Sequence, residues 1–169
     1  MTDEARNTGG ADFAALLEFL NETPNKLANF MAGLSDAELR LQNSTDEFSA
    51  LANICHLRDL ELQGYASRIK RILAEAGPAL ADFDGARAAA EGSYNNELPN
   101  VALREFQTAR RKNVETLRAV TEGRLVREGT LAGVGSITLR RLAEMMREHD
   151  EGHLEEVRVL SERMKRRTN

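Results

Sequence analysis

The chain has 169 residues, 41% of them apolar and 30% charged, with only 3 prolines; this composition excludes a disordered protein and fits one globular domain. The net charge of -4 gives no general attraction to phosphate backbones, so we expect no nucleic-acid partner, and no apolar run approaches the ~18 residues that span a bilayer. With no signal-peptide pattern and a single cysteine, Cys55, we expect a cytoplasmic protein that has no disulfide and does not bind membranes.

Apolar residues in the first part of the chain recur with the three-and-four spacing of amphipathic helices. Residues 11–34 carry the first such pattern. Pro24 interrupts it, which indicates either a kink or a restart of the helix with Thr23 as N-cap. A second helix is predicted over residues 46–76, because Gly77-Pro78 stops the pattern there. Its candidate N-caps are Ser44, Thr45 and Asp46.

The second half of the chain predicts two further helices between glycine-rich segments. Residues 77–97 mix Gly, Pro, Asn and Asp without sustained periodicity, so we expect a crossover loop with at most a helical turn in its middle. A third helix is predicted over residues 98–122, and the stretch REGTLAGVGS after it is predicted to be a loop. A fourth helix should begin at Ser136 or Thr138 and reach residue 164.

Four helical segments and no convincing period-two alternation predict an all-α protein, a four-helix bundle. The crossover of about twenty residues between the second and third helices indicates that these two do not form a simple hairpin. We expect a single domain over residues 1–169, with residues 1–10 and 166–169 flexible.

The fourth helix carries two of the chain's 3 histidines, His149 and His153, four positions apart. On a helical wheel of about 100° per residue both fall within the apolar arc, and Asp150 also turns inward, whereas the charged residues around them occupy the opposite face. An isolated pair of this kind is more often two buried histidines that hydrogen-bond to neighbours than a metal site.

The third histidine, His56, lies on the predicted second helix and changes the interpretation of the pair. Three neutral nitrogens from two helices would complete a facial set of ligands with one or more positions open for water or substrate. His56 lies on the flank of its helix's apolar arc, so it can face the fourth helix only if that flank is packed as well. Leu57 and Leu60 make such packing plausible.

Three stretches of the chain, NICHLRDLELQGYASRIKRIL, PALADFDGARAAAEGSYNNE and GSITLRRLAEMMREHDEGHLEEVRVL, carry a resemblance to a known family. Over residues 46–160 the sequence resembles the DinB-like superfamily, the YfiT-type metalloenzymes, most specifically through H-x-x-D-x-E followed by H-D-x-x-H. The resemblance implies a four-helix bundle that binds a divalent cation, zinc or nickel, through His56, His149 and His153. Relatives often pair, so a homodimer is expected.

Members of that family include thiol-dependent transferases and a thiol-dependent isomerase. The resemblance therefore implies thiol-dependent transfer as the leading reaction, with a small-molecule substrate and a low-molecular-weight thiol as a further cofactor. The alternatives are a metal-dependent hydrolase and a non-enzymatic, metal-binding stress-response protein. Relatives often have Gln where Glu156 stands, and a carboxylate near the cation could ligate it or partly cancel its charge.

The candidates for a catalytic base, or for an acceptor of an imidazole N–H, are Glu61, Asp150 and Glu156. For Glu61, as for the neighbouring Asp59, pairing with Arg58 on the helix surface is an equally good expectation. Arg58 itself lies near the centre of the apolar arc, where it could bind an anionic substrate or pair with a carboxylate across the bundle. Cys55 is expected to be an inert core residue.

Overall fold

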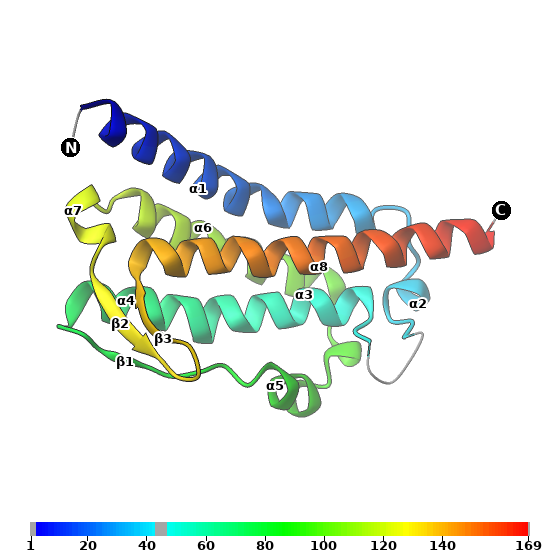
Figure 1. The fold of residues 1–169 in the computed structure, drawn as a ribbon. Helices are drawn as coiled ribbons and strands as arrows, with labels where there is room; N and C mark the ends of the chain where they lie inside the picture. The colour runs from blue at the N-terminus through cyan, green and yellow to red at the C-terminus, as the bar shows by residue number, and fades with distance from the viewer. Residues whose placement is uncertain (1–2, 43–46, 169) are drawn as a thin grey trace.

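The computed structural model describes residues 3–42 and 47–168, which form four long helical rods with a small sheet near one end (Figure 1). The rods are α1 (Asp3–Met31), the continuous run of α3 (Ala50–Asp59), η1 (Leu60–Tyr65) and α4 (Ala66–Ala74), then α6 (Pro99–Arg118) and α8 (Leu139–Thr168). The shorter elements are α2 (Asp36–Leu39), β1 (Ala79–Leu80), α5 (Gly85–Gly92), η2 (Tyr94–Asn96), α7 (Glu122–Leu125), β2 (Glu128–Leu131) and β3 (Gly135–Thr138). The predicted four-helix bundle is confirmed.

The second and third rods run in the same direction, as the colours in Figure 1 show. Arg58 pairs with Glu105, and further along both rods Asn113 donates to Glu61. α1 and α8 run parallel to each other and opposite to that pair. The long crossover of residues 77–97 makes this order possible, because a short turn would have reversed the chain.

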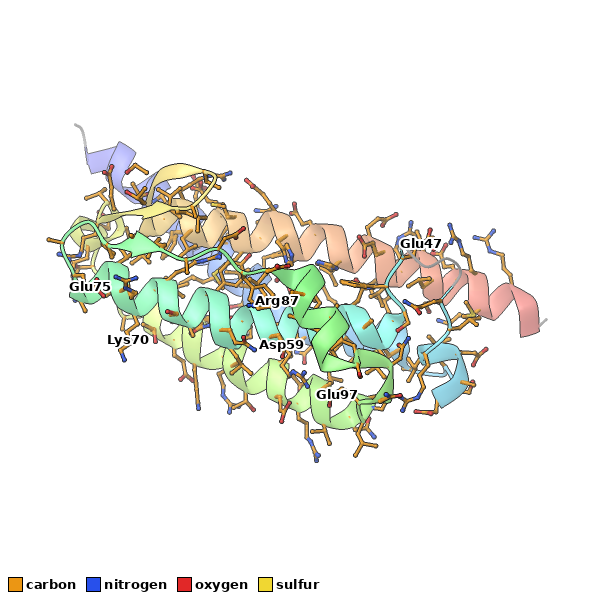
Figure 2. All side chains as sticks on the ribbon, turned by 90° about the horizontal axis from the view of Figure 1, so that it is seen from below. Glu47, Asp59, Lys70, Glu75, Arg87 and Glu97 are labelled. Atoms are coloured by element: carbon orange, nitrogen blue, oxygen red, sulfur yellow. The ribbon has the colours of Figure 1, made fainter. Side chains whose placement is uncertain are left out.

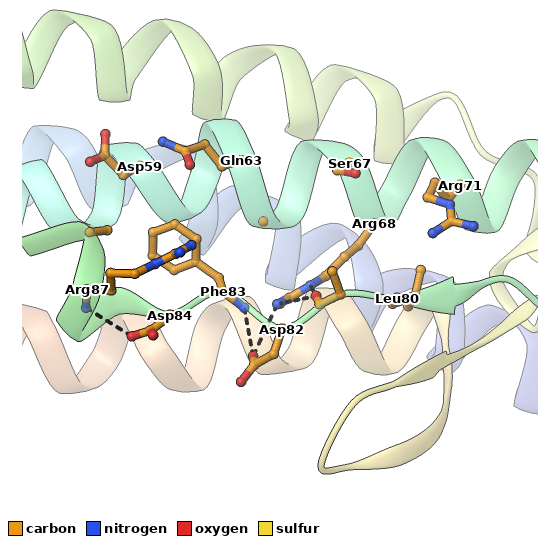
Figure 3. A pocket seen from close by; sticks show the side chains of 13 residues that line it. Asp59, Gln63, Ser67, Arg68, Arg71, Leu80, Asp82, Phe83, Asp84 and Arg87 are labelled. Atoms are coloured by element: carbon orange, nitrogen blue, oxygen red, sulfur yellow. Dashed lines mark hydrogen bonds and ion pairs between the residues drawn. The ribbon is translucent and has the colours of Figure 1, made fainter. Parts of the chain in front are cut away.

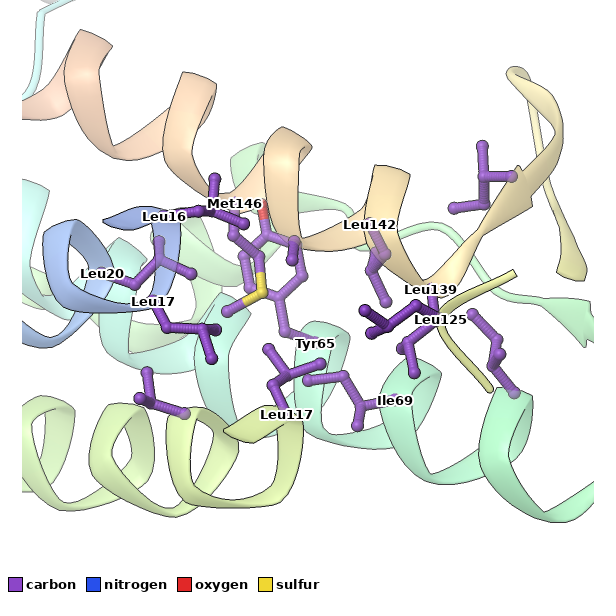
Figure 4. Packing of buried hydrophobic residues seen from close by; sticks show 14 of the residues in the cluster. Leu16, Leu17, Leu20, Tyr65, Ile69, Leu117, Leu125, Leu139, Leu142 and Met146 are labelled. Atoms are coloured by element: carbon purple, nitrogen blue, oxygen red, sulfur yellow. The ribbon is translucent and has the colours of Figure 1, made fainter. Parts of the chain in front are cut away.

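Apolar side chains from all four rods fill the interior of the bundle (Figure 4). Leu20, Ile69, Leu117 and Leu142, one from each rod, are at most 2% exposed. Burying a side chain of this size contributes roughly 1.5–3 kcal/mol, so packing of the rods is the main source of stability. No described helix is both long and apolar enough to cross a bilayer.

The second rod begins at a clear N-cap. The Ser49 hydroxyl accepts a hydrogen bond from the backbone N–H of Ala52 at 3.0 Å, which satisfies one of the free donors at the start of α3. The predicted caps Ser44, Thr45 and Asp46 lie outside the described residues.

A π-helical turn, η1, joins α3 to α4 in the middle of the second rod. A Cβ atom at Gly64 would lie 2.6 Å from Cδ1 of Leu60, so a larger residue there would displace the Leu60 side chain. π-turns insert an extra residue into a helix and occur frequently at functional sites. Here the turn begins four residues after His56.

α1 continues through Pro24, so a restart of the helix at Thr23 is wrong. Proline has no N–H, and the carbonyl of Leu20, four residues earlier, therefore loses its helical donor. Nη1 of Arg110 on α6 donates to that carbonyl at 3.2 Å instead. α1 also begins at Asp3, inside the segment expected to be flexible.

The segment predicted to be a glycine-rich loop contains a hairpin, which corrects the expectation of a loop there. β2 pairs antiparallel with β3, and β1 pairs parallel with the other edge of β2. Gly129 and Leu131 are buried while Glu128 and Thr130 are exposed, so β2 does alternate. Four residues that include a glycine are too few for a period-two pattern to be recognised.

Candidate metal centre

The structure brings the chain's 3 histidines together between α3 and α8, as predicted. His56 lies on α3, and His149 and His153 lie one turn apart on α8. Nε2 of His149 is 3.2 Å from Nε2 of His56 and 3.2 Å from Nε2 of His153. The flank of α3 that carries His56 is packed as the sequence required, because Leu57 is 1% exposed and Leu60 5%.

The spacing of the three Nε2 atoms fits a single divalent cation. Two nitrogens that each lie about 2.0–2.1 Å from a tetrahedral zinc ion are about 3.3–3.4 Å apart. The observed 3.2 Å is within the tolerance expected of a metal site. Three imidazoles also supply only part of the shell of such an ion, so this histidine triad leaves at least one position to another ligand.

Asn53 fixes the orientation and the tautomer of His153. The amide nitrogen of Asn53 donates to the carbonyl of Ser49 at 3.0 Å, which turns the amide oxygen toward His153. That oxygen lies 2.6 Å from Nδ1 of His153, so Nδ1 must carry the proton. The Nε2 lone pair of His153 therefore points at the other two histidines, as a metal ligand requires.

Burial keeps the other two imidazoles neutral. Burial, together with the neighbouring His153, lowers the pKa of His56 to about 4 and that of His149 to about 3. Neutral imidazole is the form that binds a metal. Nδ1 of both residues is buried and has no hydrogen-bond partner within the described chain, so protein contacts fix only the His153 tautomer.

His56 is held by the crossover segment as well as by α3. Its ring contacts Phe48, at 5.5 Å between ring centroids, and Phe83, at 6.0 Å. Gly85, the first residue of α5, lies against the same ring: a Cβ atom there would be 2.5 Å from Cε1 of His56. Only glycine therefore lets α5 approach the ring this closely.

Glu156 is the candidate carboxylate that lies next to the triad. Its Oε2 is 3.4 Å from Nδ1 of His153, and its side chain is 56% exposed. The hydrogen bond from His153 lowers the pKa of Glu156, so this carboxylate is ionised at neutral pH.

Glu61 and Asp150 are fully buried and both pair with Arg110, which is 1% exposed. Both Asp150 oxygens accept from the Arg110 guanidinium, and Glu61 lies 2.9 Å from Nη2 of Arg110. Asn113 donates to the other oxygen of Glu61 at 2.9 Å. In the described contacts neither carboxylate accepts from an imidazole, which corrects the expectation that Asp150 would do so. Their role as a base stays a prediction.

Arg58 pairs with carboxylates rather than standing free, which is one of the two predicted alternatives. Its guanidinium donates to Asp59 at 2.8 Å and lies 3.4 Å from Glu97; Figure 2 labels both of these carboxylates. Across the bundle it reaches Glu105 on α6 at 3.2 Å. Asp59 also accepts from the Tyr94 hydroxyl at 2.9 Å. A role of Arg58 in binding an anion stays a prediction.

Cys55, next to His56, is fully buried. Burial raises the pKa of its thiol to about 12, so it is protonated at neutral pH. This agrees with the expected inert core residue.

One cavity of about 470 Å³ lies between the second rod and the crossover (Figure 3). Phe83 forms part of its wall and also contacts the His56 ring. Arg68 reaches across it to the carbonyl of Ala81 and to Asp82, at 3.0 and 3.5 Å. These contacts hold the crossover segment against the second rod.

A second cavity, of about 480 Å³, is lined by a histidine of the triad. It lies between α8 and the residues that lead into α3. His153 and Glu156 form one side, and Phe48, Val159 and Leu160 form an apolar surface next to them. We call it the α8 cavity.

Sequence reasoning missed Asn53, Arg110 and Gly85. Asn53 gave a weak signal, because it stands one turn before His56 as a polar residue on an otherwise apolar stretch of the helix. Arg110 and Gly85 gave none, because their partners lie on other elements far along the chain.

Comparisons with known proteins agree with this architecture. The family model described as the DinB superfamily matches residues 19–157. Among solved structures, YfiT from Bacillus subtilis is similar with a TM-score of 0.81 and 21% identity, over 98% of this chain and 90% of that one. YfiT is described as "a probable metal-dependent hydrolase with an unusual four-helix bundle topology". A search of curated proteins gave no match.

Proposed function

The chain belongs to the DinB superfamily, and from this premise we propose that it is a metal-dependent hydrolase whose divalent cation, zinc or nickel, is held by His56, His149 and His153. The observation that carries the proposal is the convergence of three imidazoles beside a cavity, with Nε2 of His149 3.2 Å from Nε2 of both other histidines. When bound, such a cation supplies Lewis-acid activation of a water molecule or a carbonyl group.

Glu156 is the residue that we assign to proton transfer. Of the three candidate carboxylates, Glu61 and Asp150 are committed to the buried Arg110, whereas Glu156 is ionised and lines the α8 cavity. A carboxylate in that place can accept the proton of an attacking water and return it to the leaving group. Its half-exposed side chain is free to turn toward a substrate. Asn53 keeps the His153 ring in place during these steps.

Hydrolysis is preferred to thiol transfer because of the similarity to YfiT. YfiT, a solved structure with the same fold, is described as a probable metal-dependent hydrolase. The cavity beside His153 also favours an open site over a closed, structural one. Thiol-dependent transfer, the leading prediction from the resemblance, is the alternative. A turnover assay with and without added thiol distinguishes it from hydrolysis.

Metal content is the first test. Purified protein should carry about one divalent ion per chain by elemental analysis, as three-histidine sites of catalytic type do. His149→Ala should lose the ion. Glu151→Ala is the matched control, because Glu151 lies on the same helix and pairs only with the surface residue Arg147 in the described contacts. A wild-type protein that binds no metal at neutral pH removes the basis of the proposal.

Turnover is the second test. The metal-loaded protein should hydrolyse uncharged aryl esters or amides without added thiol, and chelation should abolish the activity. Glu156→Gln should lower kcat about 10²–10⁴-fold with the metal content unchanged. Turnover that appears only when a thiol is added would support the transferase instead. No turnover in either case would favour the non-enzymatic alternative.

A further inference from the structure

The chemistry of the α8 cavity's wall bears on which substrates the site accepts. The cavity has about 480 Å³ of space, enough for a small organic molecule. Its apolar surface is continuous with the metal centre, because the Phe48 ring both lines the cavity and packs on His56. A molecule on this surface would therefore contact His153 directly and lie next to the Phe48 ring that packs on His56.

The charged groups around the cavity are mostly paired with each other. Arg163 lies 3.9 Å from Glu47, which Figure 2 labels at the end of the bundle beside α8. Glu155 makes a two-pronged pair with Arg158 at 2.6 and 2.7 Å. Glu156 has no cationic partner in the described contacts other than His153, which is neutral in its metal-binding form. In the metal-free protein the wall thus carries one uncompensated negative charge next to His153.

We propose that the α8 cavity binds the uncharged, apolar part of the substrate, an aliphatic or aryl group of an ester or amide. The apolar group packs on Phe48, Val159 and Leu160. In the metal-free protein, an anionic group bound there would lie close to the Glu156 carboxylate, and the two like charges would repel. The inference rests on the proposed function for its link to turnover, but binding at the cavity is measurable without metal.

A pair of dyes with the same ring system tests the proposal on the metal-free protein. 1-Anilinonaphthalene is uncharged, and 8-anilinonaphthalene-1-sulfonate adds one sulfonate. We expect the uncharged dye to bind at one site per chain, with fluorescence enhancement, and the sulfonate to bind about fivefold or more weakly, as one like charge at close range implies. Glu156→Gln should reduce this difference toward twofold or less.

Two variants locate the binding site. Val159→Trp fills the cavity and should abolish binding of the uncharged dye, while Val159→Arg adds a charge to the same wall and should weaken it at least tenfold. Val126→Trp is the matched control: Val126 is 68% exposed and does not line the cavity, so binding should be unchanged. Circular dichroism of each variant checks that it is folded.

Three outcomes overturn the proposal: no binding of the uncharged dye to the folded wild type, equal binding by folded Val159→Trp, or stronger binding of the sulfonate. These outcomes are distinguishable from a failure of the proposed hydrolase. A protein that binds the dye in the cavity but holds no metal would keep the cavity assignment and lose the hydrolase. A protein that holds metal and hydrolyses esters but binds no dye would keep the hydrolase and lose the cavity assignment.

Discussion

Gly85→Ala should weaken metal binding although Gly85 has no side chain and lies on neither ligand helix. A Cβ atom at this position would be 2.5 Å from Cε1 and 3.0 Å from Nδ1 of His56, against an ordinary contact distance of 3.4–4 Å. The ring must therefore move by about 1 Å or α5 must withdraw from it. Ligand distances in metal sites vary by only about 0.2 Å, so a shift of this size removes His56 from its place.

The expected loss follows from what supporting residues contribute in other metal sites. Changing a residue that orients a ligand typically lowers metal affinity 10–100-fold, which is about 1.4–2.8 kcal/mol. Competition of wild type and Gly85→Ala with a chromogenic zinc chelator at pH 7.5 measures this difference. The stability of the metal-free protein should change by no more than about 1 kcal/mol, because alanine is a better helix former than glycine.

Two other glycines provide controls for the substitution itself. A Cβ atom at Gly123 or Gly152 would meet no atom within 4 Å, and neither residue has a positive φ. Gly152 also lies on α8 between two of the ligands. Both alanine variants should bind zinc as wild type does. Wild-type zinc affinity in Gly85→Ala would contradict the prediction, because it would mean that α5 moves away while the His56 ring keeps its position.

Three further predictions concern the groups around the triad. Asn53→Leu should weaken zinc binding 10–100-fold and release the His153 tautomer, as ¹⁵N shifts of the metal-free protein would show. The metal-free protein should be most stable above pH 6.5 and should lose up to about 1.4 kcal/mol of unfolding free energy per histidine per pH unit as the pH falls toward 4. The reason is that His56 and His149 have folded pKa values of about 4 and 3, so they bind protons more readily in the unfolded chain. Arg110→Met should cost about 3–5 kcal/mol in urea unfolding, since it leaves two buried carboxylates without their cation.

Each of these predictions has a result that contradicts it. Equal zinc affinity of Asn53→Leu and wild type would mean that the hydrogen bond to Nδ1 does not orient the ring. A pH dependence that is unchanged in His149→Leu would show that other groups cause the acid destabilisation. A loss below about 1 kcal/mol in Arg110→Met, the range of a surface pair, would mean that water reaches Glu61 and Asp150.

The parts of the fold and site that follow helical periodicity could be predicted from the sequence. The three-and-four spacing indicates the four rods, and it places His149 and His153 on the inner face of the last one. His56 can reach them only if the flank of its helix is packed, and the burial of Leu57 and Leu60 meets that condition.

The features that escaped prediction depend on contacts between distant segments or on very short patterns. Arg110 donates to the Leu20 carbonyl, which lacks a helical donor because of Pro24. This contact depends on how α6 packs against α1, and no local sequence pattern predicts that packing. η1 adds one residue to a helix, and periodicity over a few turns does not register it. The pairing of β1 with β2 joins strands from segments far apart in the chain, such as Ala79 with Thr130.

A crystal structure of the zinc-loaded protein, with anomalous data collected on both sides of the zinc edge, would show directly whether the three histidines bind one ion. We expect a single strong anomalous peak about 2.0–2.1 Å from Nε2 of His56, His149 and His153, with a non-protein ligand on the side of the α8 cavity. An anomalous map with no peak between these three nitrogens, or with zinc bound elsewhere on the chain, would contradict the assignment of the metal centre.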